Sequence, residues 1–244
     1  MSDPITASTI LLGAGGGVVV PFVNKVVGPA AEELGLLLSE GLRKFRLKKQ
    51  LALFKEAHQM LADAGVDAKQ VSLKLLVPLL ENASLEDSPV LSTKWAALLA
   101  NAANSNVSKE PHPSFVDTLR QLTPSQAKIL DLIFEGHSEQ RVQSSANPAS
   151  GYYRKDMLFL KNESGLSMSE LAFDIANLLR LDTCKDYMGM LENNLIEIAH
   201  ASFPGKNTIN TEDFVIQQYK IVGSVYGLEF VRACTAPVAS SPGA

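Results

Sequence analysis

Apolar side chains recur every three or four residues through most of this chain, which is the spacing of amphipathic helices. The first such stripe runs from Pro29 to Ala64 and predicts one long helix, which ends at Gly65 because glycine readily adopts a left-handed conformation. Four shorter helices are expected over residues 72–83, 88–102, 115–122 and 123–136. The pattern therefore predicts a mainly α-helical protein that begins with a helical bundle over residues 26–136.

The pattern changes after a polar segment rich in serine and asparagine, residues 137–151, which is expected to be a flexible loop. The elements expected beyond it are helices over residues 168–175 and 184–193, strands over residues 195–199 and 214–222, and a last helix over residues 228–234. The tail, residues 235–244, is rich in alanine, serine, proline and glycine and is expected to be disordered.

This order of three helices followed by two strands is typical of a winged helix-turn-helix. The helix over residues 123–136 is the first of the three, and the helix over residues 184–193 occupies the recognition position. Residues 152–234 are therefore predicted to form a small winged-helix-like α/β part that follows the helical bundle.

The N-terminal residues 1–25 form an apolar, glycine-rich lead-in. Its apolar run from Ile10 to Val23 is about 14 residues long, short of the roughly 20 that span a bilayer, and Asn24 and Lys25 end it. The run therefore predicts a buried or partly ordered lead-in to the first helix. Insertion into a membrane surface or a partner, and a true membrane span, are the alternatives.

Composition excludes a disordered chain, since 46% of the residues are hydrophobic and 20% are charged. The formal net charge is -4, so the chain as a whole does not attract nucleic acid. Cys184 and Cys234 are too few to staple a chain of this length and are predicted to be free thiols in a reducing compartment. We expect a cytoplasmic location, with membrane association through the N-terminal segment as the alternative.

One segment concentrates positive charge. Five of seven consecutive positions are basic, namely Arg43, Lys44, Arg46, Lys48 and Lys49. Two interpretations stay open: a solvated face of a helix whose apolar residues contact the core, or a site for an anionic partner. That partner would be a membrane surface, a nucleic acid or an acidic protein.

Charge argues against DNA binding by the winged-helix-like part. Between Asp182 and Glu197 there is one basic residue, Lys185, and there are four acidic ones. A helix that enters the major groove needs arginine or lysine for phosphates and base edges. A protein-interaction or structural role is therefore favoured, and a winged-helix nucleic-acid-binding regulator is the alternative.

Catalytic motifs are absent from the sequence. The four histidines, His58, His112, His137 and His200, lack the spacing of metal ligands, and no nucleophile-elbow motif is present. We therefore expect a protein that is not an enzyme and that uses no metal and no cofactor.

Four stretches resemble a known protein family. They are Gly28–Gly35, Lys74–Glu86, Trp95–Ala102, and His112–Val116 with the Leu122–Thr123–Pro124 that follows. Together they resemble the abortive infection alpha (Abi-alpha) family of bacterial proteins, most closely between Val26 and Phe134. The residues singled out within these stretches are Lys74, Pro78, Glu81, Trp95, His112 and Pro113.

The resemblance implies a role in abortive infection, in which an infected bacterium stops growing before phage can spread. It implies no catalytic residues. The expected function is phage defence through binding of a phage or host component, or of the membrane surface, and self-association is an open alternative. Trp95 is expected in the core, while Lys74, Glu81 and Glu86 are either surface and cap charges or a polar cluster around Trp95.

Overall fold

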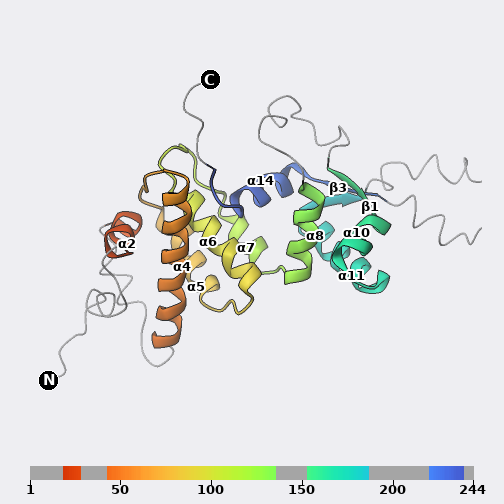
Figure 1. Ribbon diagram of the computed structural model, residues 1–244, viewed down its shortest axis with the longest axis horizontal. Helices are drawn as coiled ribbons and strands as arrows, with labels where there is room; N and C mark the ends of the chain where they lie inside the picture. The colour runs from red at the N-terminus through yellow and green to blue at the C-terminus, as the bar shows by residue number, and fades with distance from the viewer. Residues whose placement is uncertain (1–18, 29–42, 136–152, 187–219, 239–244) are drawn as a thin grey trace, which may run out of the picture. The chain divides into compact units, whose positions relative to one another are not determined.

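The computed structural model describes residues 19–28, 43–135, 153–186 and 220–238, with side chains in α2 from Pro21 and in α4 from Lys48 onward (Figure 1). Within these ranges the protein is mainly helical and has one small antiparallel sheet. The helices are α2 (Val19–Val27), α4 (Arg43–Asp63), α5 (Leu73–Ala83), α6 (Pro89–Ala103), α7 (Ser114–Leu119), α8 (Pro124–Phe134), α10 (Met157–Ser164), α11 (Met168–Arg180) and α14 (Val225–Ala233). The strands are β1 (Arg154–Asp156), β2 (Cys184–Asp186) and β3 (Lys220–Gly223).

The chain divides into two compact units. The first consists of Met1–Leu122 together with Arg232–Ala244, and the second of Thr123–Val231. The second unit is therefore an insertion in the first along the sequence. The predicted boundary at residues 137–151 lies outside the described residues.

The first unit is built around α6. Every residue from Trp95 to Ala100 is buried, so this stretch of the helix has no polar face. A helix that is apolar on all sides belongs in the interior of a protein. α4 and α5 pack against α6, and α7 packs against α5.

Local sequence signals account for helix ends in both units. Ser88 caps α6 ahead of Pro89, and Thr123 and Gln126 form a reciprocal capping box ahead of α8. Gly65, with φ +65°, ends the helix that precedes it. The predictions of helices over residues 72–83, 88–102, 115–122 and 123–136 are confirmed, with small shifts at their ends. Of the predicted long helix, residues 29–42 lie outside the described part.

The last part of the apolar lead-in is a helix packed on α4. The Phe22 ring meets the rings of Phe54 and His58 edge-on, at centroid distances of 6.2 and 5.1 Å. Val26 is fully buried, and its carbonyl oxygen accepts a hydrogen bond from the Val71 N–H at 3.0 Å. No helix among the described residues is long and apolar enough to cross a membrane. Residues 10–18 of the apolar run are outside the described ranges.

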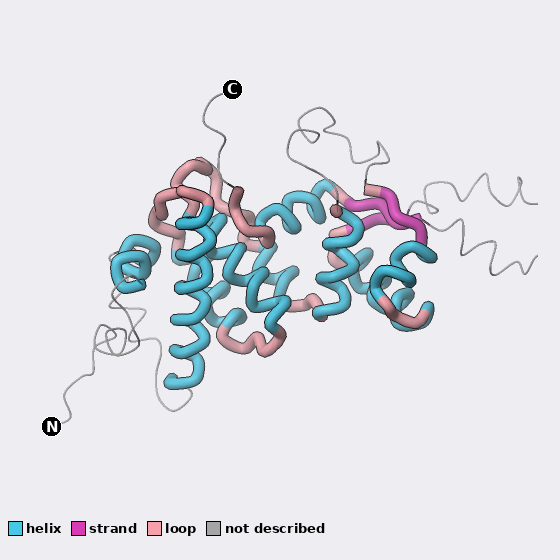
Figure 2. The backbone as a smooth tube through the Cα atoms, in the orientation of Figure 1, coloured by secondary structure: helices cyan, strands magenta, loops and turns pink. Residues whose placement is uncertain are grey.

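The second unit contains the sheet, in which β3 lies between β1 and β2 and is antiparallel to both (Figure 2). The order along the chain is α8, β1, α10, α11, β2, β3, and the start of α14. The predicted helix over residues 168–175 is confirmed and extends to Arg180. Its capping box, Ser167 with Glu170, is present as the sequence indicated.

The predicted helix over residues 184–193 is wrong at its start, because Cys184–Asp186 form strand β2. Asp182 has a positive φ of 54°, which turns the chain sharply after α11. The next residues then pair with β3, so that Cys184 faces Gly223 and Lys185 faces Val222. Tertiary pairing overrides the local helical pattern here. The rest of that segment and the predicted strand over residues 195–199 lie outside the described residues.

Other differences from the prediction are smaller. The described end of the predicted strand over residues 214–222 is in β3, and the predicted helix over residues 228–234 begins earlier, at Val225. β1 and α10 were not predicted. An available signal for α10 was Asp156, whose Oδ1 accepts a hydrogen bond from the Phe159 N–H at 2.7 Å as an N-cap.

Two glycines allow the elements of the second unit to approach closely. A Cβ atom on Gly223 would overlap the Phe134 ring, and one on Gly227 would overlap the carbonyl oxygen of Thr183. Hydrogen bonds hold the same junction, since the Ser224 N–H donates to that oxygen at 3.2 Å. The Gly227 N–H donates in turn to Ser224 Oγ at 2.8 Å.

We expect the substitution Gly227→Ala to lower the free energy of unfolding by about 3 kcal/mol, since a backbone carbonyl cannot move aside cheaply. The matched control is Gly165→Ala. Gly165 has φ +77° and nothing within 4 Å of its Cβ position, so only backbone strain of about 1 kcal/mol is expected. Differential scanning calorimetry of both variants measures the difference. Equal losses would contradict the close packing described here.

Candidate functional site

The strongest candidate for a binding site is the basic segment at the start of α4. The helix begins at Arg43, has no acidic residue in its first turn, and carries all five basic residues in its first seven positions. The described part of α4 therefore begins with a dense run of positive charge, which a bound anion would partly neutralise.

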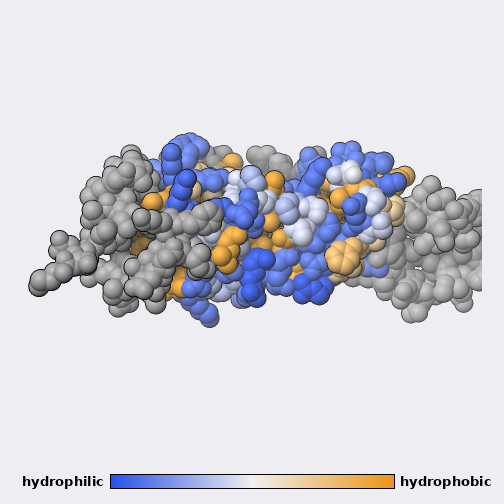
Figure 3. Space-filling view, turned by 90° about the horizontal axis from the view of Figure 1, so that it is seen from below, coloured by the Kyte–Doolittle hydropathy of each residue, from blue (hydrophilic) through white to orange (hydrophobic). Residues whose placement is uncertain are grey.

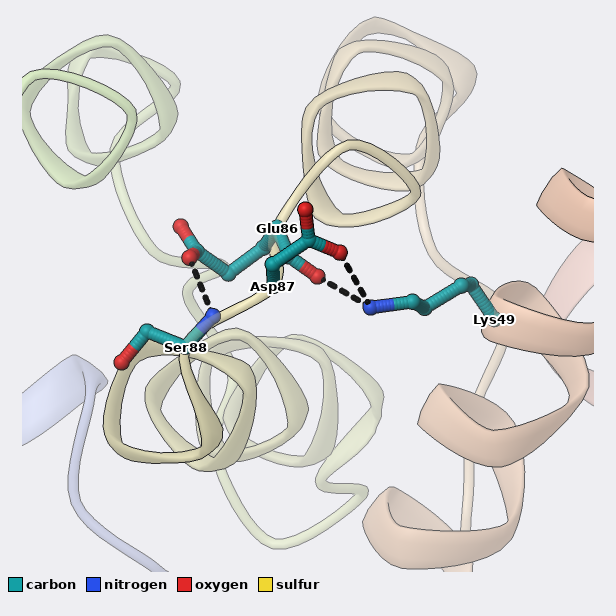
Figure 4. Close-up of polar contacts among 4 residues, drawn as sticks. All are labelled: Lys49, Glu86, Asp87 and Ser88. Carbon is teal, nitrogen blue, oxygen red and sulfur yellow. Dashed lines mark hydrogen bonds and ion pairs between the residues drawn. The ribbon is translucent and has the colours of Figure 1, made fainter.

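Lys49 ties this segment to the rest of the first unit (Figure 4). Its ammonium donates hydrogen bonds to the carbonyl oxygen of Glu86 at 2.6 Å and to Oδ1 of Asp87 at 3.0 Å. The lysine side chain is 29% exposed, whereas that of Asp87 is 87% exposed. Because the ion pair is largely in water, the bond to the backbone carbonyl contributes most of the stabilisation. Lys49 thus joins α4 to the loop between α5 and α6.

The carboxylate of Glu86 points away from Lys49 toward the start of α6 (Figure 4). Its Oε1 accepts a hydrogen bond from the Ser88 N–H at 2.8 Å, and Ser88 Oγ accepts from the Leu91 N–H at 3.5 Å. These bonds satisfy N–H groups that have no partner within α6. The loop therefore fixes the start of α6 and anchors α4 at the same time.

Burial changes sharply over three successive positions of α4, because each residue is turned by about 100° from the last. Lys48 is exposed, Lys49 is half-buried, and Gln50 is buried with Nε2 at 3.5 Å from the Leu80 carbonyl oxygen. Lys48 is therefore placed to meet a partner in solution. Lys49 has a structural role in addition to any role in binding.

The structure keeps the motif residues of α5 and α6 apart. Lys74 and Glu81 are exposed on α5, while Trp95 is 1% exposed in the core. Among the described residues the Trp95 Nε1–H has no hydrogen-bond partner, so neither Glu81 nor Glu86 binds it. Pro78 lies within an unbroken α5, and its carbonyl oxygen accepts a hydrogen bond from Asn82 Nδ2 at 2.7 Å.

His112 and Pro113 form the start of α7. Pro113 is the N-cap, and the Ser114 N–H donates to His112 Nδ1 at 3.3 Å. Ser114 Oγ also lies 2.8 Å from this nitrogen, and the ring meets Phe115 edge-on at a centroid distance of 6.3 Å. The local role of both residues is to shape a helix terminus.

Sequence reasoning missed a buried polar network in the second unit. Gln126 Nε2 donates to Oδ1 of Asp174 at 2.9 Å, and Asn177 Nδ2 donates to Gln126 Oε1 at 2.8 Å. Gln126 is 2% and Asp174 is 7% exposed. The available signal was the position of Asp174 on the apolar stripe of α11, between Leu171 and Ile175. Its partners satisfy a group that would otherwise be costly to bury.

A second missed residue is Asn101, in the third family stretch. Its Nδ2 amide donates to the carbonyl oxygens of Ala233 and Thr235, at 2.9 and 2.7 Å, and lies 3.0 Å from that of Ala97. All four residues belong to the first unit. Asn101 thus attaches the chain that follows α14 to α6.

The described part of the chain holds no group of three or more His, Cys, Asp or Glu residues arranged to bind a metal. Burial raises the pKa of the Cys184 thiol to about 12. At neutral pH this thiol is therefore protonated and a poor nucleophile. Cys234 is also buried and unpaired with another cysteine.

Comparison with known families gives one match. The family model described as abortive infection alpha matches residues 43–234, from the first residue of α4 to the residue after α14. The basic segment therefore lies inside the match, whereas α2 lies outside it. No curated protein and no solved structure matches the chain.

We expect the substitution Lys49→Met to lower the free energy of unfolding by about 1 kcal/mol, because the Glu86 carbonyl and Asp87 lose their donor. The matched control Lys48→Met removes the same charge from an exposed position and should change it by less than about 0.5 kcal/mol. Urea unfolding followed by the fluorescence of Trp95, the one tryptophan of the chain, measures both. A loss of the same size in both variants would exclude the structural role assigned to Lys49.

Proposed function

The chain belongs to the abortive infection alpha family, and from this premise we propose that it is a bacterial phage-defence protein that acts by binding a partner. The partner is a phage or host component, or the membrane surface, with an anionic face. The observation that carries this proposal is the electropositive start of α4, which lies within the family match. An anion bound there would offset the repulsion among five cations that lie within seven residues of the chain.

Binding is preferred to catalysis because Asp174 and Glu170 already have structural roles and the Cys184 thiol is unreactive. Asp174 holds Gln126, and Glu170 caps α11 through its contacts with Ser167. Burial keeps Cys184 protonated at neutral pH. We accordingly propose a mechanism that is not enzymatic and that uses no metal or cofactor.

We further propose that the second unit is a winged helix. The support is the element order α8, β1, α10, α11, β2, β3 together with the strand order β1-β3-β2. In this arrangement α11 takes the recognition position that the sequence analysis gave to residues 184–193. α11 carries Arg180 as its one cation, with Glu170 and Asp174 as acids, so this helix is poorly suited to contact phosphates. The module is therefore assigned to protein contacts, and nucleic-acid binding is the less favoured alternative.

The proposal is tested by phage challenge of cells that carry or lack the gene. We expect the quadruple variant with Arg43, Lys44, Arg46 and Lys48 changed to glutamine to lose protection, whereas Lys49 is kept for its structural contact. Each cation near an anionic surface contributes about 1 kcal/mol, so binding should weaken at least about a hundredfold. The charge-matched control changes the exposed Lys55, Lys74, Lys109 and Lys185 to glutamine and should still protect.

Further measurements on the purified protein separate the partners. Sedimentation with phosphatidylserine vesicles tests the membrane surface, and a gel shift with duplex DNA at low salt tests the winged-helix alternative. Absence of protection by the wild-type gene would overturn the defence role. Full protection by the quadruple variant would overturn the role of the basic segment, and hydrolysis of nucleotides or nucleic acid would overturn the non-enzymatic mechanism.

A further inference from the structure

α11 presents an exposed aromatic side chain in the second unit. Phe173 is 76% exposed, the highest value among the large apolar residues that the structure describes. Apolar side chains on the face drawn in Figure 3 form separate patches between polar ones, and single exposed apolar residues are normal in soluble proteins. Exposure alone therefore does not identify Phe173 as part of a binding surface, and the residues around it on the helix must be considered.

Those neighbours form a seam suited to helix pairing. The buried side of α11 is formed by Leu171, Asp174, Ile175 and Leu178. On the opposite side, exposed residues follow at intervals of four, three and four, namely Ser169, Phe173, Ala176 and Arg180. This is the interval at which side chains of one helix meet a second helix. Phe173 is the single large apolar residue in the seam, and the exposed Ala172 and Ala176 leave room beside it.

Charge at the two ends of the seam is self-complementary. Glu170 lies in the first turn and Arg180 in the last turn, and both are exposed. In an antiparallel pair of identical helices centred between residues 174 and 175, Phe173 of each copy lies opposite Ala176 of the other. Arg180 then lies at the level of Ser169 and Glu170 of the other copy. A parallel pair would instead place like charges together.

We propose that the exposed face of α11 binds α11 of a second copy of this chain, in an antiparallel pair related by a two-fold axis. Phe173 of each copy packs over Ala176 of the other, and Arg180 pairs with Glu170 at both ends. A two-fold axis makes every such contact occur twice, which is how a single patch becomes a dimer interface. The inference deepens the proposed function by naming one contact surface of the second unit and its partner.

The size of the patch sets the strength of the dimer. A standard interface buries about 800 Å² per partner, and one pair of short helices covers less than this. The expected association is therefore weak, with a Kd on the order of 10–100 µM. Sedimentation velocity on the full chain at concentrations from about 1 to 500 µM covers this range.

The variant Phe173→Glu should raise the Kd at least tenfold, because it removes the packed ring and places a carboxylate in the seam. The matched control is Leu85→Glu, which introduces the same charge at a 63% exposed apolar position of the first unit and should dimerise as wild type does. Arg180→Glu should raise the Kd about three- to tenfold, since it puts like charges opposite each other. Circular dichroism checks that each variant retains its helices.

A wild-type chain that stays monomeric at 500 µM would overturn the proposal, as would a dimer that Phe173→Glu leaves intact. Dimer loss in Leu85→Glu to the same degree would also overturn it. If the wild type is monomeric and Phe173→Glu nevertheless loses phage protection, the face binds a different protein. The experiments distinguish failure of the dimer proposal from failure of the proposed function. A chain that dimerises without protecting cells overturns only the proposed function, whereas a monomeric chain that protects cells overturns only the dimer.

Discussion

The burial of residues 95–100 of α6 on all sides is the constraint on which the first unit depends. Its alanines are small and allow close packing of neighbouring helices, but they supply little apolar area themselves. Larger buried side chains come from α6 itself, through Leu91, Leu98 and Leu99, and from α5, through Leu75, Leu76, Leu79 and Leu80. Trp95 of α6 is buried even though its indole N–H has no acceptor among the described residues. Packing around this ring must therefore outweigh the desolvation of one polar group.

The same constraint explains the polar contacts at the start of α6. A buried helix needs its first N–H groups satisfied by the chain that leads into it, and Glu86 and Ser88 provide this. The loop they form presents the Glu86 backbone carbonyl to α4, where it accepts a hydrogen bond from the Lys49 ammonium. Lys49, one of the five clustered cations, thereby stabilises the loop that leads into α6, whereas its neighbour Lys48 is exposed to solvent.

Many of the helices in both units could be predicted from the sequence because their signals are local. Ser88–Pro89 and Thr123–Pro124 mark helix starts wherever they occur, and the apolar stripes of α5 and α6 identify their buried sides. Strands β1 and β2 could not be predicted in this way, since three residues carry no periodicity and each strand exists only through its pairing with β3. The basic segment was also visible as a candidate, but the difference between Lys48 and Lys49 depends on a loop nearly forty residues away in the sequence. Long-range contacts of this kind leave no mark on single-sequence patterns.

The contacts of Asn101 have a consequence for how the protein is made. They join α6 to residues 233 and 235, which the ribosome adds only after the whole of the inserted second unit has been synthesised. During translation the first unit therefore lacks the contacts of Asn101 with residues 233 and 235, whereas residues 123–231 are continuous in sequence and can fold as they are synthesised. The inserted unit is thus free to fold before the unit that surrounds it in sequence is complete. The first unit is therefore completed only after residues 123–231 have been synthesised.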